Sequence, residues 1–403
     1  MPRIGCAGKP RNEDHRRNVP ALRFPEFTDE WKEYTLGDIT DFSKERVYTQ
    51  ALSSDNYVAT ENMLQDYQGI STASNVPSNV NAIKFSKGDV LLSNIRPYLK
   101  KVWYADREGG CSADVLVFKA LPTCASDFLH HILANDRFIN FAMSGAKGVK
   151  MPRGDKEQMK TYIIGLPSIE EQKKIAKFLS LLDERIATQV RIIEDLKKLR
   201  GAIIEKLLNG RGPHKIRLGD VGSFIRGLTY SSNDVVEKEG VLVIRSNNIV
   251  NGSSLDYSND TVQVNKQISS EQHLRCGDIV ICMANGSSSL VGKSSYYDGR
   301  CLSSITIGAF CGIYRSNEPL VKWLFQTSTY RRYIWNSLQG GNGAIANLNG
   351  EDILNMSFAL PDTATKKHVI ELLTSIDSMI KNDAALYDLY SLQKQYLLRQ
   401  MFI

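Results

Sequence analysis

Amide, hydroxyl and basic side chains recur at corresponding places in the two halves of this sequence. Asn and Arg can form paired hydrogen bonds with adenine and guanine edges, and Lys, Ser and Thr can bond phosphates. Neighbouring glycines let the backbone approach a ligand closely. The residue types therefore predict nucleic-acid contacts by Thr60, Asn62, Ser93, Asn94, Arg96, Lys101, Lys147, Lys150 and Arg153 in the first half, and by Arg245, Asn247, Asn248, Asn285, Ser287, Ser288, Lys293, Asn342 and Asn347 in the second.

The landmarks around these residues are the same in both halves. Gly88-Asp89-Val90 and Gly277-Asp278-Ile279 each open a predicted strand that leads into a polar loop, and Lys101 and Lys293 follow just before aromatic strands. A solvated loop explains any single one of these residues equally well. Their parallel placement is what supports the set as a binding surface.

Enzyme signatures are absent from the sequence. Gly286–Ser294 resembles a phosphate-binding loop, but the required spacing puts a glycine at 287, where Ser287 stands, and the next residues indicate a strand rather than a helix. The pair His130-His131 lacks a metal-binding spacing and is interpreted as a surface or capping pair. No Asn-Pro-Pro-aromatic run of an amino-methylating site occurs. We therefore predict no catalytic and no metal-binding residues.

Composition is that of a globular protein with room for two or more domains. The chain has 403 residues, a net charge of +6, a pI near 8.8 and no Cys-x-x-Cys among its seven cysteines. Free buried thiols are expected at Cys276, Cys282, Cys301 and Cys311. No apolar run approaches the roughly 20 residues needed to span a bilayer. These features predict a cytoplasmic protein without membrane contact, with a disordered basic tail over residues 1–20.

The sequence is an internal repeat. Leu166-Pro167-Ser168 returns as Leu360-Pro361-Asp362, 194 residues later, and Leu36-Gly37-Asp38 returns as Leu218-Gly219-Asp220 at a shorter offset. Two similar α/β domains are predicted at 21–166 and 211–360. Their expected strands are 56–59, 90–92, 102–104 and 116–118, then 241–244, 279–283 and 305–314, and their expected helices are 127–143 and 320–338.

Each domain is followed by a long predicted helix, over 167–210 and 361–403. Apolar residues in the first helix alternate in steps of four and three, which is a coiled-coil seam, and the second repeats it at +194. The seams comprise Ile175, Leu179, Leu182, Ile186, Gln189, Ile193, Leu196, Arg200, Ile203 and Leu207, and Val369, Leu373, Ile376, Ile380, Asp383, Tyr387, Tyr390, Lys394, Leu397 and Met401. The predicted fold is therefore α+β: a pseudo-twofold tandem repeat of two domains joined by two antiparallel helices.

The polar residues within the seams suggest a register. Pairing residues whose numbers sum to 583 sets Gln189 against Lys394 and Arg200 against Asp383. A shift by one heptad would place a charge on a leucine or isoleucine, which is costly without a partner. The alternative is two separate helices, each packed on its own domain. Apolar Phe178, Ile192 and Ile204, beside the seam, are expected to be exposed for partners.

The pattern resembles the specificity subunits of type I restriction–modification systems over nearly the whole chain from Val19. The resemblance rests on Leu22–Phe27 with Trp31, on Leu36-Gly37-Asp38, and on Leu166–Ala176 with Leu179–Asp183. The second copy departs from it, because Thr363–Lys367 lacks the Glu-Glu-Gln of the first.

The resemblance implies two target-recognition domains, each of which reads half of a split, asymmetric double-stranded DNA sequence, and two helices that hold them apart. Such a subunit catalyses nothing and binds no cofactor. It docks two methyltransferase subunits and, in the full complex, two restriction subunits. S-adenosylmethionine, ATP and Mg²⁺ are expected on those partners. The alternative hypotheses are a coiled-coil scaffold that does not bind DNA and an NTPase that uses the 286–294 loop.

Overall fold

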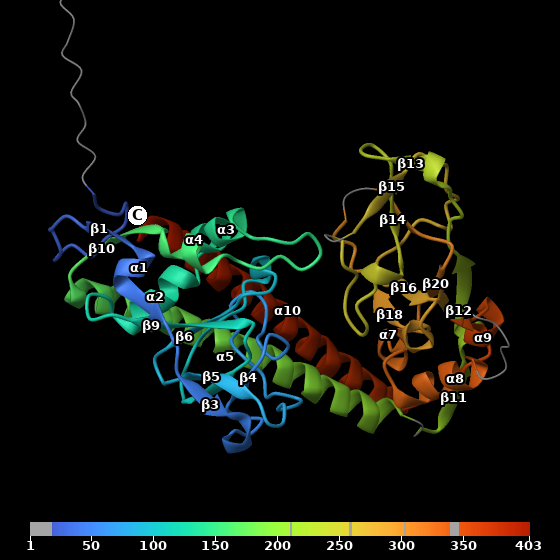
Figure 1. Ribbon diagram of the computed structural model, residues 1–403. Helices are drawn as coiled ribbons and strands as arrows, with labels where there is room; N and C mark the ends of the chain where they lie inside the picture. Colours follow the sequence, from blue (N-terminus) through green and yellow to red (C-terminus); the bar gives the residue numbers. More distant parts are fainter. Residues whose placement is uncertain (1–17, 210–211, 258–259, 302–303, 339–345) are drawn as a thin grey trace, which may run out of the picture. The chain divides into compact units, whose positions relative to one another are not determined.

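The computed structural model describes residues 18–209, 212–257, 260–301, 304–338 and 346–403, so most of the predicted tail 1–20 lies outside it. The chain divides into two compact units, residues 1–191 with 385–403, and residues 192–384. Each unit holds one of the two repeated domains with part of each long helix (Figure 1). Among the described residues, no helix combines the length and hydropathy that a bilayer crossing requires.

The domain of unit 1 is built from two four-stranded sheets and a strand pair. The sheet orders are β2-β9-β6-β7 and β3-β5-β8-β4, and β1 pairs with β10. The strands are β1 (Lys32–Thr35), β2 (Thr40–Phe42), β3 (Arg46–Tyr48), β4 (Tyr57–Val58), β5 (Asn81–Phe85), β6 (Val90–Ser93), β7 (Val102–Tyr104), β8 (Gly109–Cys111), β9 (Val115–Ala120) and β10 (Ile163–Leu166). The helices are α1 (Leu36–Ile39), η1 (Thr49–Ala51), η2 (Pro97–Leu99), α2 (Ser126–Leu133), α3 (Asp136–Ser144), α4 (Lys156–Lys160) and α5 (Ile169–Leu208).

Unit 2 repeats this plan. The sheet β12-β20-β16-β18 corresponds to β2-β9-β6-β7, and β11 pairs with β22 as β1 pairs with β10. The strands are β11 (His214–Arg217), β12 (Gly222–Arg226), β13 (Val235–Val236), β14 (Val241–Ile244), β15 (Val262–Val264), β16 (Ile279–Cys282), β17 (Ala284–Asn285), β18 (Ser294–Tyr296), β19 (Ile305–Ile307), β20 (Cys311–Ser316), β21 (Ala346–Asn347) and β22 (Ser357–Leu360). The helices are α6 (Leu218–Val221), η3 (Ser232–Asp234), η4 (Ser246–Asn248), η5 (Ser288–Leu290), α7 (Val321–Leu324), α8 (Ser328–Leu338), α9 (Gly350–Leu354) and α10 (Thr363–Gln400).

The predicted α/β domains and long helices are confirmed, with local corrections. The helix expected over 127–143 is two helices, because the Asn135 side chain accepts from the Arg137 amide (3.0 Å) and starts α3 anew. The helix expected over 320–338 is likewise split into α7 and α8, where the Thr327 hydroxyl accepts from the Tyr330 amide. The strand expected over 305–314 is two strands, β19 and β20. Cys276 is exposed and not buried, because it precedes β16 rather than lying within it.

Both long helices begin at a capping side chain. The amide of Glu171 donates to the Ser168 hydroxyl at the start of α5, and the amides of Ala364 and Thr365 donate to the Asp362 carboxylate at the start of α10. These contacts satisfy amides that lack an intrahelical acceptor. The predicted helix starts therefore follow from Ser and Asp at the repeated position.

Each domain packs against the start of one long helix and the end of the other. In unit 1 the core includes Leu179 of α5 together with Leu397 of α10 and Phe402, just after the end of α10. In unit 2 it includes Leu208 of α5 with Val369 of α10. The two helices therefore run antiparallel in both units, as the sequence predicts.

The seam is confirmed and the predicted register is wrong. None of the twenty seam residues is exposed. In unit 1, however, Lys394 Nζ lies 2.5 Å from Asp183 Oδ1, and in unit 2 Arg200 Nη1 lies 3.0 Å from Asp377 Oδ1. Both pairs have residue numbers that sum to 577 rather than 583. The shift is close to one heptad.

The reason lies beside the seam. The seam pattern alone disfavours the observed register, because that register places Lys394 on apolar side chains. A buried charge that loses its partner costs about 3–5 kcal/mol. The aspartates of the repeated Leu182-Asp183 and Ile376-Asp377 motifs stand next to seam positions and supply the missing partners. The long side chains of Lys394 and Arg200 reach these carboxylates beside the seam, so the two basic residues do not need a polar residue opposite them within the seam.

The missing Glu-Glu-Gln of the second copy has a structural substitute. In unit 1 Glu171 forms a bidentate ion pair with Arg23, and the buried Gln172 amide donates to the carbonyls of Thr123 and Pro167. In unit 2 Lys366, the repeat equivalent of Gln172, pairs with Glu318 just after β20 (2.6 Å). Both helix starts are therefore tied to their own domain by different chemistry.

Replacing Asp377 should destabilise unit 2 strongly. Its carboxylate accepts from Arg200, Lys322 and the Trp323 indole, and its side chain is 12% exposed. Asp377→Ala leaves two cations without this partner, and we expect a loss of about 3 kcal/mol in the free energy of unfolding, measured by urea denaturation of the full chain. Asp388→Ala, at an exposed position of the same helix, is the control and should change it by less than about 0.5 kcal/mol. Equal effects of the two variants would contradict this role.

Candidate nucleic-acid interface

Two predicted DNA-contacting loops of unit 1 meet in space. Residues 93–96 begin at the last residue of β6 and run into the loop after it, and residues 145–155 connect α3 to α4. They join through a β-bridge between Ile95 and Arg153, and the Arg96 amide donates to the Pro152 carbonyl (2.7 Å). The fold thus brings Asn94, Arg96 and Arg153 together, although they are about 60 residues apart in sequence.

The second of these loops doubles back on itself. Lys147 and Arg153 exchange two backbone hydrogen bonds of 2.9 Å each, so that residues 147–153 form a narrow hairpin, here called the finger. It projects from unit 1 between α3 and α4 (Figure 1). All three predicted cations of the finger, Lys147, Lys150 and Arg153, have exposed side chains.

Two of these cations form solvent-exposed ion pairs with carboxylates. Lys147 pairs with Asp155 (2.8 Å), which raises the pKa of the lysine through a direct hydrogen bond, and Arg153 pairs with Asp114 (3.0 Å). Their side chains are 82% and 58% exposed. Exposed ion pairs contribute about 0–1 kcal/mol, so a phosphate can compete for these cations at little cost.

At the base of the finger, polar atoms remain without a hydrogen-bond partner among the described residues. These are the buried Oδ1 of Asn94 and Nε of Arg96. A buried polar atom without a partner costs about 1–3 kcal/mol. Both residues belong to types that bond base edges with two hydrogen bonds.

Unit 2 joins the corresponding loops in the same way. Ala284 pairs with Asn347 between β17 and β21, and the Leu348 amide donates to the Met283 carbonyl (2.8 Å). The loop after β16 is again tied to the segment before the last short helix. Asn342 lies outside the described residues.

Three predicted contact residues instead serve the fold. Ser93, Asn62 and Asn248 are 1%, 6% and 1% exposed. The Asn62 side chain accepts from the Ala59 amide (2.6 Å), and the Asn248 side chain accepts from the Arg245 amide (2.9 Å), which is the same turn in both repeats. Burial removes these three side chains from the predicted DNA contacts, because a duplex cannot reach them.

The remaining predicted residues lie at or near the surface. Lys101 Nζ donates to the Thr60 carbonyl (2.6 Å), and the side chains of Arg245 and Asn247 both donate to Asp260. The Asn285 side chain accepts from the Ser287 amide (3.0 Å). Ser287, Ser288 and Asn347 are exposed, and Lys293 is half-buried. Gly286 is followed by the single 3-10 turn η5 (288–290) and the strand β18 (294–296), and not by the α-helix that a phosphate-binding loop requires.

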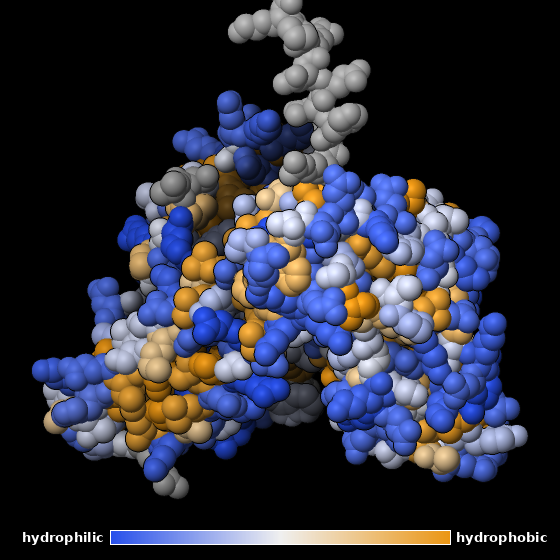
Figure 2. All heavy atoms as spheres, turned by 90° about the vertical axis from the view of Figure 1, so that its left-hand side faces the viewer, coloured by the Kyte–Doolittle hydropathy of each residue, from blue (hydrophilic) through white to orange (hydrophobic). Residues whose placement is uncertain are grey.

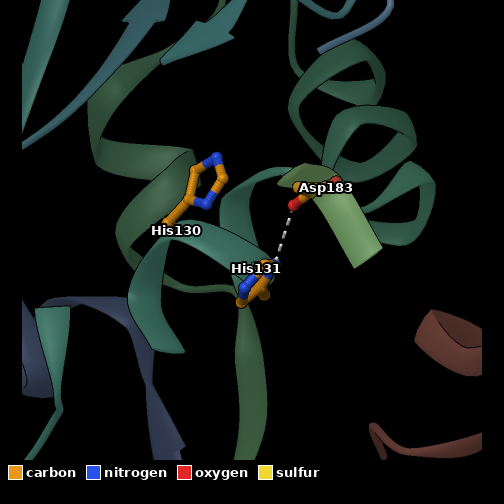
Figure 3. A group of neighbouring side chains, drawn as sticks. All are labelled: His130, His131 and Asp183. Atoms are coloured by element: carbon orange, nitrogen blue, oxygen red, sulfur yellow. Dashed lines mark ion pairs between the residues drawn. The ribbon is translucent and has the colours of Figure 1, made fainter. Parts of the chain in front are cut away.

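A polar cluster lies where α2 meets the long helices in unit 1 (Figure 3). His130, His131 and Asp183 place one nitrogen or oxygen each within 4.8 Å of the others, and His131 Nδ1 lies 4.0 Å from Asp183 Oδ2. The Lys394 ammonium already neutralises Asp183. The repeat equivalent in unit 2 is the Asp377 cluster, where Lys322 and Trp323 of α7 take the place of the histidines. A cationic lysine and an indole cannot hold a metal, so the repeated feature is an ion-pair junction.

One histidine of this junction, His131, is buried, in contrast to its interpretation from the sequence, whereas His130 is half-buried. His131 is 0% exposed, and burial together with the Lys394 ammonium lowers its pKa to about 3. Burial, His131 and Lys394 also hold the pKa of His130 well below its usual range. Both histidines are therefore neutral in the folded protein near pH 7.

Sequence reasoning missed two groups of residues. Asp183 and Asp377 had a usable signal, because they recur at the same 194-residue offset as Arg200 and Lys394. The exposed apolar side chains of the finger, Val149 and Met151, had none, since a lone Val or Met predicts burial. Ile204 was expected to be exposed and is 1% exposed, packed in the core of unit 2.

The class of protein follows from these features. Two similar α/β domains pack against an antiparallel helix pair and carry matching polar loops on their surfaces. The chain is a tandem repeat of two α/β domains.

Its family is shown by sequence. Residues 28–198 and 213–388 match the type I restriction modification DNA specificity domain. The chain therefore belongs to the family of specificity subunits of type I restriction–modification systems, which are non-catalytic and bind no cofactor.

Individual relatives are more distant. The chain is 31% identical over 176 residues to the type I restriction enzyme EcoKI specificity subunit of Escherichia coli, and 25% identical over 274 residues to the MjaVIII specificity subunit of Methanocaldococcus jannaschii. These matches cover 42% and 60% of this chain, and span 37% and 61% of the relatives' lengths. In fold it resembles the S subunit of a type I system from M. genitalium, with a TM-score of 0.58 at 16% identity over 96% of this chain and 99% of that one.

The buried histidines predict a pH dependence of stability. Because the folded pKa of His131 lies near 3, below its unfolded value of about 6.5, the unfolded state binds the extra proton first as pH falls. Stability is then fully present above about pH 6.5 and falls by about 1.4 kcal/mol per pH unit for this histidine between about pH 6.5 and 5. His131→Gln should flatten this slope in urea titrations at successive pH values, whereas His214→Gln, at an exposed position, should not. An unchanged slope in the first variant would refute the assignment.

Proposed function

We propose that this subunit reads a two-part, asymmetric DNA sequence, with one half recognised by each of two target-recognition domains at 21–166 and 211–360. One observation carries the proposal: in both domains the loop after β6 or β16 is tied to the segment before the last short helix, and polar residues gather there. Two similar domains whose loops differ in sequence and length are suited to recognise two different half-sites. The long helices, at 167–210 and 361–403, would set the spacing between them.

Charge and residue type favour double-stranded DNA as the ligand of these loops. The exposed cations of the finger can neutralise phosphates, while Asn94, Arg96 and, in unit 2, Asn285 and Asn347 belong to types that bond base edges. Such contacts make affinity fall steeply with salt. A coiled-coil scaffold without DNA binding, the alternative function, does not explain why unit 1 brings exposed cations and the unpaired Asn94 amide oxygen together at one place.

The helix pair offers a surface for partner subunits. In unit 1 the exposed apolar residues of the long helices include Phe178, Leu181, Leu386 and Leu389, and in unit 2 they include Ile192, Leu199, Leu372 and Met379. Many of them directly precede a seam position on their helix, and in an antiparallel pair these flanks of the two helices lie on the same side. Apolar residues also gather in patches on the face drawn in Figure 2.

The complex formed on this surface supplies the chemistry. Membership of a type I restriction–modification complex follows from the family. We assign the helix surface to two methyltransferase subunits, which bring S-adenosylmethionine, and expect two restriction subunits with ATP and Mg²⁺ in the full complex. We expect the complex to act in the cytoplasm, where its DNA target would be found.

A domain exchange tests the reading function. Replacing residues 214–359 with the corresponding domain of a related subunit should change one half of the methylated sequence and leave the other half unchanged. The measurement is the sequencing of methylated adenines in cells that express the chimera with its methyltransferase subunit. An unchanged motif, or a DNA affinity of the complex that does not depend on salt, would contradict the proposal.

Introducing a charge among the exposed apolar side chains of α5 and α10 tests the docking surface. Leu199→Glu and Leu386→Glu should preserve the fold, because both positions are exposed, and should weaken methyltransferase-subunit binding by roughly tenfold or more. Titration calorimetry with the purified methyltransferase subunit measures the effect. Lys197→Glu, at an exposed polar position of α5, is the control. Full binding by both leucine variants would exclude this surface.

A further inference from the structure

The tip of the finger presents two apolar side chains to solvent. Val149 is 103% exposed and Met151 is 52% exposed. Val149 has the largest exposed fraction among the exposed large hydrophobic residues of the described chain. Val149 buries no apolar area on folding, and Met151 buries only part of its side chain, so the tip adds little to the stability of the domain.

The tip is nevertheless held in one shape. The Lys147–Arg153 hydrogen bonds close the finger, and the Arg96 amide fixes the Pro152 carbonyl at its base. Gly148 adopts a φ of +97°, and a Cβ there would lie 3.3 Å from the Met151 carbonyl oxygen. A preshaped tip loses little conformational entropy when it binds.

The width of the finger selects the groove that it can enter. Two chain segments lie side by side between residues 147 and 153, as in a two-stranded ribbon. The major groove of B-DNA, about 12 Å wide, admits such a ribbon, whereas the minor groove, at about 6 Å, does not. Lys150 lies within the tip, between Val149 and Met151, and Lys147 and Arg153 flank it; cations in these positions can contact the phosphates beside the groove.

In the major groove only one base carries an apolar group. The C5-methyl of thymine projects there, and the other groups on the base edges are hydrogen-bond donors and acceptors. We propose that the finger enters the major groove and that Val149 and Met151 contact a thymine methyl, so that the half-site of unit 1 includes a thymine read by its methyl group. This inference rests on the proposed function.

Uracil substitution tests the contact directly. In the complex with its methyltransferase subunit, each thymine of the unit 1 half-site is replaced in turn by deoxyuridine, which differs only by the methyl group. We expect one position at which affinity falls about fourfold, the effect of burying one methyl group. In the variant Val149→Ser with Met151→Ser, thymine and uracil at that position should bind equally.

A matched control separates tip chemistry from general damage. Val80→Ser removes a valine that is 47% exposed elsewhere in unit 1 and should retain the fourfold preference for thymine. If the wild-type complex prefers its target over other DNA but is indifferent to uracil throughout this half-site, the inference is overturned and the proposed function stands. A persistent thymine preference in the double serine variant also overturns it. If the wild-type complex has no sequence preference at all, the proposed function fails.

Discussion

The arrangement of this molecule depends on an ion pair that occurs twice. A basic residue in the seam of one long helix binds an aspartate beside the seam of the other, as Lys394 with Asp183 in unit 1 and Arg200 with Asp377 in unit 2. Each pair joins α5, α10 and one domain, through His131 on one side and through Lys322 and Trp323 on the other. The domains therefore attach to the helix pair at polar junctions set within apolar contacts.

Such a junction contributes more to the choice of helix register than to the free energy of unfolding. Replacing a buried ion pair by apolar side chains is often neutral or stabilising, whereas leaving one charge unpaired costs about 3–5 kcal/mol. A slip by one heptad would keep most apolar seam residues facing one another but would separate Lys394 from Asp183 and Arg200 from Asp377. The apolar seam thus drives association, and the ion pairs select one register among several that bury similar area.

The two repeats keep this plan while their details diverge. The start of α5 is bound by Arg23–Glu171 and Gln172, and the start of α10 by Lys366–Glu318. The strand order of the second sheet also differs. The order is β3-β5-β8-β4 in unit 1, with β5 next to β8, and β13-β15-β14-β19 in unit 2, with β15 next to β14. The residues at the helix junctions and the strand pairing of the second sheets have both changed, while the central ion pair of each junction is kept. A specificity subunit can change what each domain reads without changing how the domains are held.

The sequence alone determined the repeat, the α/β class, the capped ends of the long helices and the seam, because these depend on local spacing and on the periodicity of apolar residues. The repeat marks Asp377 as a candidate partner of Arg200, but only the packed helices show that this aspartate beside the seam, and not Asp383 within it, pairs with Arg200 in unit 2. The sequence also could not separate Asn62, which caps a turn, from Asn94, which lies at the base of the finger, although both are polar loop residues. Burial and long-range contact decide such cases, and they exist only once strands and loops far apart in sequence have packed together.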